Sequence, residues 1–94
     1  MQDRKGEKSR MEKKIIVGLK AGLQARKASQ FVQLASTFDS EIKIIKDEKT
    51  IEAKSIMGIM SIGIREGDDI TLSVKGEEEQ KALITLENFL LNVE

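Results

Sequence analysis

The 94-residue chain contains no histidine, cysteine, proline, tryptophan or tyrosine. Without histidine it lacks the commonest metal ligand, the usual general base and the usual nitrogen carrier of a phosphoryl group. Without cysteine it forms neither disulfides nor thiolate nucleophiles, as is common for proteins of a reducing cytoplasm. We therefore expect no metal site, no cofactor and no enzymatic activity, and a cytoplasmic location.

An excess of one charge sign and long apolar runs are also missing. Sixteen basic residues balance sixteen acidic ones, so no general attraction to nucleic acid or to another polyanion is expected. No apolar run approaches the roughly 20 residues that span a membrane, and the charged first residues lack the apolar region of a signal peptide. With only three phenylalanines as aromatic residues, a base-stacking RNA platform is not expected either.

Residues 1–11 read as an extension in front of a single domain. Most of the first ten residues are polar or charged and follow no apolar period, which is typical of a disordered tail. The codons of Lys5-Gly6-Glu7 can resemble a bacterial ribosome-binding sequence, and Met11 follows at a suitable interval. We therefore hypothesise that translation starts at Met11, and we expect one domain over residues 12–94.

Apolar spacing predicts elements in the order β-α-β-β-α-β-α. Apolar runs predict four strands, at residues 15–19, 42–45, 50–53 and 70–74, the middle two forming a hairpin. Three- and four-residue spacing predicts amphipathic helices over residues 25–38 and 77–93, and Glu77, Glu78 and Glu79 suit the start of the second. Three helices on one face of a four-stranded antiparallel sheet would bury these stripes, so the expected fold is an α+β open-faced sandwich.

The segment Lys54–Ile62 predicts the remaining helix and stands out from the rest of the chain. Ser55 is followed by five large apolar residues in seven positions, which predicts a very short helix capped by the serine side chain. A surface helix needs an apolar sector only about 100° wide, and these residues point in too many directions for one such sector. Exposed apolar side chains beside a modifiable hydroxyl predict a docking surface with a switch at its edge.

The apolar residues of this helix are expected to divide between core and surface. At least Ile56 or Ile59 should be partly buried, whereas Met57 and Met60 should be exposed. The structural alternative is that Ser55 serves only as a helix cap and that the apolar residues belong to the core.

Two motifs in this chain resemble those of a known family. Gly22–Ala28 reads Gly-Leu-Gln-Ala-Arg-Lys-Ala, and Ala53–Ile62 follows at a characteristic separation. Together they resemble the HPr family of the bacterial sugar phosphotransferase system, over about residues 12–93, which implies the open-faced sandwich fold of that family. The family carries its phosphorylated histidine where this chain has Gln24. Because an amide cannot form a phosphoimidazole, phosphohistidine transfer is not expected.

Gln24 followed by Ala25-Arg26 resembles the catabolite-repression branch of the family, the Crh proteins. This resemblance implies phosphorylation of Ser55 by HPr kinase/phosphorylase, and then binding to CcpA, a LacI-type repressor, as its corepressor. The partner-binding residues that it implies are Gln24, Arg26, Lys27, Ile56, Met57, Ile59 and Met60. The family usually has proline where this chain has Lys27, and proline suits a first helical position.

Other interpretations of the sequence stay open. One is a phosphocarrier paralogue with an unusual acceptor, and another is an adaptor that binds metabolic enzymes through the same surface. Proteins that resemble Crh can exchange their first strand between two chains. Because a loop containing Gly22 joins residues 15–19 to the rest of the chain, a strand-swapped homodimer is the alternative to a monomer.

Overall fold

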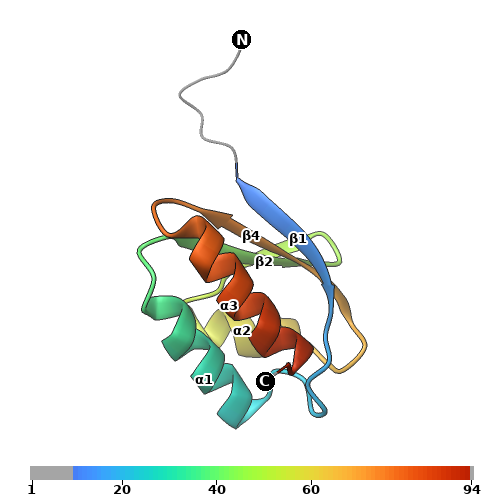
Figure 1. Ribbon diagram of the computed structural model, residues 1–94. Coiled ribbons are helices and arrows are strands. Elements are labelled where there is room, and N and C mark those ends of the chain that lie inside the picture. The colour runs from blue at the N-terminus through green and yellow to red at the C-terminus, as the bar shows by residue number, and fades with distance from the viewer. Residues whose placement is uncertain (1–9, 94) are drawn as a thin grey trace.

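A four-stranded antiparallel sheet carries three helices in the computed structural model, which describes residues 10–93 (Figure 1). The elements, in chain order, are β1 (Met11–Ile16), α1 (Ala25–Ser36), β2 (Glu41–Lys46), β3 (Lys49–Glu52), α2 (Ile56–Ile62), β4 (Asp69–Lys75) and α3 (Glu79–Leu91). The predicted element order and the α+β open-faced sandwich are confirmed. Of the predicted N-terminal extension, residues 1–9 lie outside the described residues.

The strands lie side by side in the order β1-β4-β2-β3, so the last strand of the sequence occupies an interior position. β1 pairs only with β4, Ile15 lying opposite Ile70, and β2 pairs with β4 on one side and β3 on the other. The predicted hairpin joins β2 to β3 through Asp47 and Glu48. Both of these residues have positive φ, the backbone geometry that two-residue hairpin turns require.

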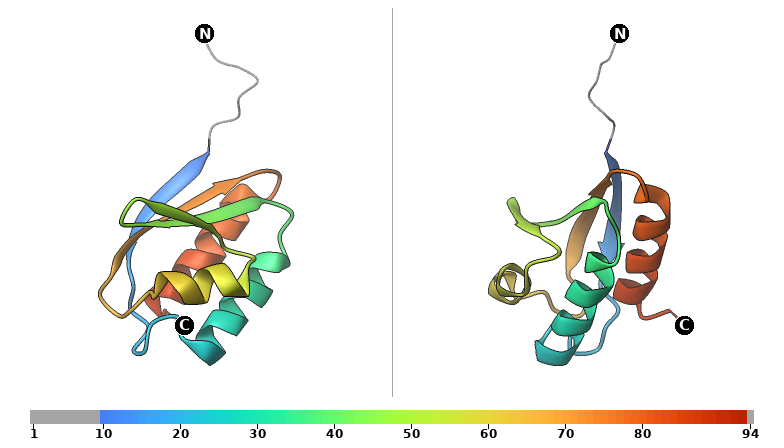
Figure 2. Two further views of the ribbon diagram at one scale, coloured as in Figure 1. Left: turned by 180° about the vertical axis from the view of Figure 1, so that it is seen from behind. Right: turned by 90° about the vertical axis from the view of Figure 1, so that its left-hand side faces the viewer.

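The core lies between the sheet and the helices, and α1 packs against both α2 and α3 (Figure 2). Its largest fully buried side chains include Phe31 of α1, Ile44 and Leu72 of the sheet and Leu86 of α3. Burial of a side chain of this size contributes about 1.5–3 kcal/mol, so the three layers stabilise one another. No helix in residues 10–93 is both long and apolar enough to cross a membrane.

The first strand differs from the prediction of residues 15–19, because it begins at Met11 and ends at Ile16. β1 lies at the edge of the sheet, where charged side chains are tolerated. Its Lys13 lies on the side of α3, where its Nζ is 3.3 Å from the Oε2 of Glu87. The buried Val17 continues the chain outside the strand. Arg10, just before β1, also contacts the sheet, because its Nε donates a hydrogen bond to the Oγ of Ser73.

Both long helices end earlier than their apolar spacing predicts. α1 ends at Ser36, and Phe38 is buried beyond it. α3 ends at Leu91 because Asn92 takes the left-handed conformation that stops helices, so Val93 is exposed rather than part of the buried face.

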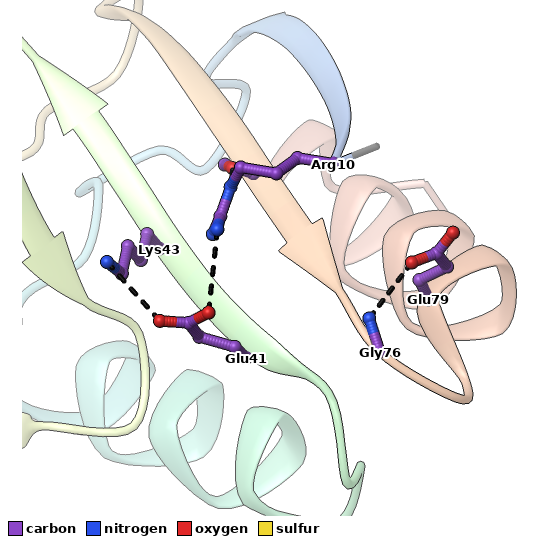
Figure 3. A network of polar contacts seen from close by, with 6 residues as sticks. Arg10, Glu41, Lys43, Gly76 and Glu79 are labelled. Atoms are coloured by element: carbon purple, nitrogen blue, oxygen red, sulfur yellow. Dashed lines mark hydrogen bonds and ion pairs between the residues drawn. The ribbon is translucent and has the colours of Figure 1, made fainter. Parts of the chain in front are cut away.

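The start of α3 is fixed by a glutamate that turns back toward the preceding strand. Of the three predicted glutamates only Glu79 lies in the first turn, where its Oε1 accepts a hydrogen bond of 2.9 Å from the Gly76 N–H (Figure 3). Glu78 is the N-cap residue, and its carboxylate accepts a hydrogen bond from the Asp39 N–H instead. The predicted negative charge at this helix start is therefore partly used to hold neighbouring loops.

Candidate partner-binding site around Ser55

Ser55 caps α2, as the sequence predicts. Its backbone is extended, with φ −107° and ψ 113°, and its Oγ accepts a hydrogen bond of 3.1 Å from the Gly58 N–H. A side chain at position 58 would crowd this contact, because a Cβ there would lie 3.3 Å from the serine Oγ. At the other end, Gly63 takes a left-handed conformation and stops the helix after two turns. The serine is half-buried at the edge of the molecule.

The apolar residues of α2 divide sharply between surface and core. Met57 is 79% exposed, Met60 48% and Ile56 41%, whereas Ile59 is completely buried. With 3.6 residues per turn, the three exposed side chains lie within an arc of about 100° and Ile59 lies outside it. The expected exposure of both methionines is confirmed. The assignment of Ile59 to the partner surface is wrong, because this side chain belongs to the core. We call Ile56, Met57 and Met60 the outward arc.

The segment before α1 is joined to the segment that follows α2. The Leu23 N–H donates a hydrogen bond of 3.0 Å to the Ile64 carbonyl. Gly22, with φ +66°, lies so close to this carbonyl that a Cβ would be 2.3 Å from its oxygen. Gln24 then caps α1 with an extended backbone and no side-chain cap bond, and both Gln24 and Arg26 are exposed. The first motif is therefore joined to the segment that follows the second motif directly in the chain.

Lys27 reaches toward α3. Its Nζ lies 5.6 Å from the centroid of the Phe89 ring, and this ring packs in turn against Phe31 at 5.9 Å between centroids. A cation over an aromatic face at an exposed site contributes about 0.5–1 kcal/mol. Because α1 begins at Ala25, Lys27 is its third residue and not its first, so the comparison with an N-terminal proline concerns the first turn as a whole.

Two lysines fix α2 at its ends. The Nζ of Lys54 donates to the Phe38 carbonyl at 2.7 Å, and the Nζ of Lys46 donates to the Gly63 carbonyl at 3.0 Å. Lys46 also lies 2.9 Å from Asp68, whose carboxylate accepts a further hydrogen bond from the Arg65 N–H. The hydrogen bond from Lys46, followed by that from the backbone of Arg65, holds the pKa of Asp68 below its ordinary value. The short helix is thus held in place from outside.

Known proteins that are similar to this chain identify its family. The family model described as the PTS HPr component phosphorylation site matches residues 11–92. The chain belongs to the HPr family. The HPr-like protein Crh of Halalkalibacterium halodurans is 52% identical over 80 residues, which cover 85% of this chain and 95% of that protein. The resemblance expected from the two motifs is confirmed.

Solved HPr-family structures share the fold. The phosphocarrier protein HPr from Bacillus anthracis superposes with a TM-score of 0.86 at 46% identity, covering 88% of this chain and 99% of that one. The crystal structure of Crh from Bacillus subtilis gives a TM-score of 0.74 at 41% identity, with 100% and 98% of the two chains covered. That Crh structure is described as a dimer with a swapped domain.

Sequence reasoning located Ser55 and the exposed methionines but missed the groups that hold them. Lys46, Lys54 and Asp68 lie in turns or at element ends, where a charged residue is ordinarily only solvated. Their partners are backbone carbonyls and a carboxylate from other elements. No local pattern in the sequence identifies such contacts. In residues 10–93, no three acidic side chains gather in a way that could hold a metal ion.

Proposed function

We propose that this chain is a regulatory, non-catalytic HPr-like protein of carbon catabolite repression in the cytoplasm. HPr kinase/phosphorylase modifies Ser55, and the phosphoprotein then binds a CcpA-type repressor as its corepressor. The observation that carries this proposal is the outward arc of Ile56, Met57 and Met60 beside the hydroxyl of Ser55. Contiguous exposed apolar side chains are the kind of surface that a protein partner covers.

Phosphorylation of Ser55 changes the surface and leaves the fold in place. It adds about −1.5 to −2 charges and strong acceptor oxygens at the edge of the outward arc. The core residue of α2, Ile59, is completely buried and keeps its packing. Arginine or lysine of the partner pairs with the phosphate through charge-assisted hydrogen bonds, and the flexible methionines supply an adaptable apolar contact.

The remaining surface residues of the proposal lie at the start of α1. Arg26 is exposed there and supplies a cationic contact beside Gln24. Lys27 contributes its charge from the same turn, although its ammonium lies over Phe89 and so faces α3. Ile59 is omitted from the proposed surface because it is buried.

Phosphoryl transfer through histidine is not part of this proposal. Gln24 occupies the position where the family carries its histidine, and the chain contains no histidine at all. An amide nitrogen is too weakly basic to form the high-energy phosphoimidazole. Incubation with phosphoenolpyruvate and enzyme I should therefore leave the chain unlabelled. A stable phosphoryl group acquired from enzyme I would instead support the alternative, a phosphocarrier paralogue.

The decisive experiment is incubation of the purified chain with ATP and HPr kinase/phosphorylase, followed by mass spectrometry to locate phosphate. We expect one phosphate on Ser55, and none on Ser55→Ala. A histidine-bearing HPr in the same tube shows that the kinase is active. If that protein is modified and this chain is not, the proposed regulation is wrong.

The second step measures repressor binding with the phosphorylated and the unmodified chain. Fluorescence anisotropy of labelled operator DNA, with repressor held near half saturation, should rise only on addition of the phosphoprotein. A phosphoprotein that leaves the repressor unaffected but binds a metabolic enzyme would favour the adaptor interpretation.

We also propose a strand-swapped homodimer as an accessible assembly. β1 is an edge strand that pairs with β4 alone, and residues 17–24 connect it to α1. The Crh relative from Bacillus subtilis, at 41% identity, is described as a swapped dimer. Size-exclusion chromatography with light scattering across protein concentrations should show a dimer that forms and dissociates slowly. A single monomeric species at every concentration would contradict this assembly.

A further inference from the structure

Ser73 is buried on a face of the sheet that no helix covers. Its neighbours Leu72 and Val74 are buried core residues, so alternation along β4 places Ser73 on the opposite, open face. It is nevertheless only 1% exposed. The side chain of Arg10 accounts for this burial, because its Nε donates a hydrogen bond of 2.7 Å to the serine Oγ.

Arg10 crosses β4 and reaches β2. Its Nη1 lies 3.5 Å from Oε1 of Glu41, and the other carboxylate oxygen of Glu41 lies 3.3 Å from the Nζ of Lys43 (Figure 3). The hydrogen bond and charge of Lys43, and after them the charge of Arg10, hold the pKa of Glu41 below its ordinary value. The side chain of Arg10 is 29% exposed, so the guanidinium packs on the sheet rather than extending into solvent.

This contact joins β1 to a strand with which it does not pair. The backbone of β1 forms a ladder with β4 only, whereas the residue just before β1 bonds side chains on both β4 and β2. The family match begins at residue 11, so Arg10 lies immediately outside it.

We propose that in the 94-residue chain, which carries Arg10 ahead of Met11, Arg10 acts through Ser73 and Glu41 as a latch that controls how often β1 detaches from the sheet. Detachment of the edge strand requires the guanidinium to leave both partners, and a charge-assisted hydrogen bond in a half-buried setting resists that step. With the latch removed, β1 opens more often while the rest of the fold stays closed.

The latch controls the rate of strand exchange without setting its equilibrium. This part rests on the proposed strand-swapped homodimer. In a closed monomer Arg10 bonds its own Ser73 and Glu41, and in a swapped dimer the same contacts form with the second copy. Both closed states lose the same contacts when Arg10 is replaced. The opened chain, which lies between the two closed states, makes none of these contacts. Replacement of Arg10 therefore lowers its free energy relative to both closed states.

Hydrogen exchange of the full chain tests the latch directly, whichever assembly the protein adopts. Arg10→Ala should raise the exchange rate of the protected β1 amides about tenfold, the effect of losing one hydrogen bond to a charged group. Amides of α1 serve as the internal reference and should not change. Ser73→Ala should have a similar effect, and the double variant should add little, because each change removes the same contact.

Lys14→Ala is the matched control, because it removes one positive charge from the exposed side of the same strand. Arg10→Lys keeps the charge but cannot donate from two nitrogens of a planar group, so it should resemble Arg10→Ala. If Arg10→Ala behaves like Lys14→Ala, or raises exchange in α1 as much as in β1, the latch is wrong.

The assembly is tested separately from the latch. Mixing labelled and unlabelled protein should show faster subunit exchange in Arg10→Ala by the same factor, at an unchanged dissociation constant. A shifted dissociation constant would overturn the proposed symmetry of the latch. If the protein is monomeric at every concentration, the proposed dimer is wrong. The exchange rates of the β1 amides then still test the proposed latch.

Discussion

The helices α2 and α3 are both rich in large apolar residues, yet they use them in opposite ways. α3 buries four residues along one stripe, namely Ala82, Leu83, Leu86 and Leu90. α2 fully buries only Ile59 and packs Ile62 partly against the core, whereas Ile56, Met57 and Met60 are exposed. The apolar stripe of α3 therefore serves core packing, whereas the exposed apolar residues of α2 form the outward arc that we propose as a partner surface.

The two helices also differ in what holds them. α3 is thirteen residues long and is stabilised mainly by its buried stripe. α2 has seven residues, too few for an isolated helix to be stable. Its position depends on Ser55 at the start, on the buried Ile59 and on the contacts of Lys46 and Lys54 with neighbouring carbonyls. These contacts allow the outward arc to remain free of core packing.

Truncation of core residues should have the largest effects on stability. Leu86→Ala in α3 and Ile59→Ala in α2 should each lower the free energy of unfolding by about 2–5 kcal/mol, because each leaves a cavity. Met57→Ala should change it by no more than about 0.5 kcal/mol, as is usual for exposed positions. Urea unfolding followed by far-ultraviolet circular dichroism measures these values in a chain without tryptophan. A loss at Met57 equal to that at Leu86 would place the outward arc in the core.

For binding of the phosphorylated chain to the repressor, we expect the exposed residues of α2 to matter most. Met57→Ala in the phosphorylated chain should weaken repressor binding about tenfold, since a central apolar side chain of an interface contributes more than 1 kcal/mol. Ile84→Ala is the matched control, because Ile84 is an exposed apolar residue of α3, at 53% exposure. It should change the affinity less than twofold. Equal losses for the two variants would mean that exposed apolar area alone, and not its place on α2, determines binding.

The cap of α2 should matter more for stability than the cap of α3. Ser55→Ala removes the bond from Gly58 and should cost about 1 kcal/mol. Glu78→Ala should cost less than half of that, because Glu78 makes no cap bond to its own helix and its contact with Asp39 is exposed. Thermal unfolding of both variants measures the difference. A larger loss for Glu78→Ala would show that its link to the loop before β2 supports α3 as a whole.

The buried face of α3 could be predicted from the sequence because it depends on the spacing of apolar residues within one helix. Spacing of three and four residues predicts one apolar face, of which four members are buried and Phe89 is partly buried. The residues of this predicted face are Ala82, Leu83, Leu86, Phe89, Leu90 and Val93. Val93 has the same spacing but lies beyond Asn92, whose left-handed backbone the spacing does not reveal. The same limit applies to Phe38, which is buried after its helix has ended.

For α2 the sequence predicts the cap at Ser55 and an excess of apolar residues, but not which of those residues are buried. Five apolar residues in two turns offer no single stripe, so only the packed fold shows that Ile59 is the one that points inward. The contact between Arg10 and Ser73 on the open face of the sheet could not be predicted either, because these residues are 63 positions apart in the chain. The charged start of β1 likewise hid an edge strand, because Glu12, Lys13 and Lys14 are all exposed and give that segment no apolar alternation.

The smallest expected effect concerns the loop that follows α2 and its response to acid. Because the contacts from Lys46 and Arg65 lower the pKa of Asp68 in the folded state, they favour folding when the carboxyl is ionised. Their contribution is complete above about pH 5 and is lost as the pH falls through the lowered pKa. For a partly exposed pair it should stay below about 1 kcal/mol.

The effect of acid on this loop can be measured against α3 as an internal reference. Lowering the pH from about 5 to about 3 should lower the protection factors of the amides in residues 63–68, corrected for the intrinsic exchange rate at each pH, more than those in α3, because only this loop depends on the ionised carboxylate of Asp68. Asp68→Asn should already exchange faster at the higher pH and should lose this pH dependence. If the variant keeps the full pH dependence of the original chain, another acidic group governs the loop. The end of α2 would then be held by the contact of Lys46 with the Gly63 carbonyl, which acid does not break.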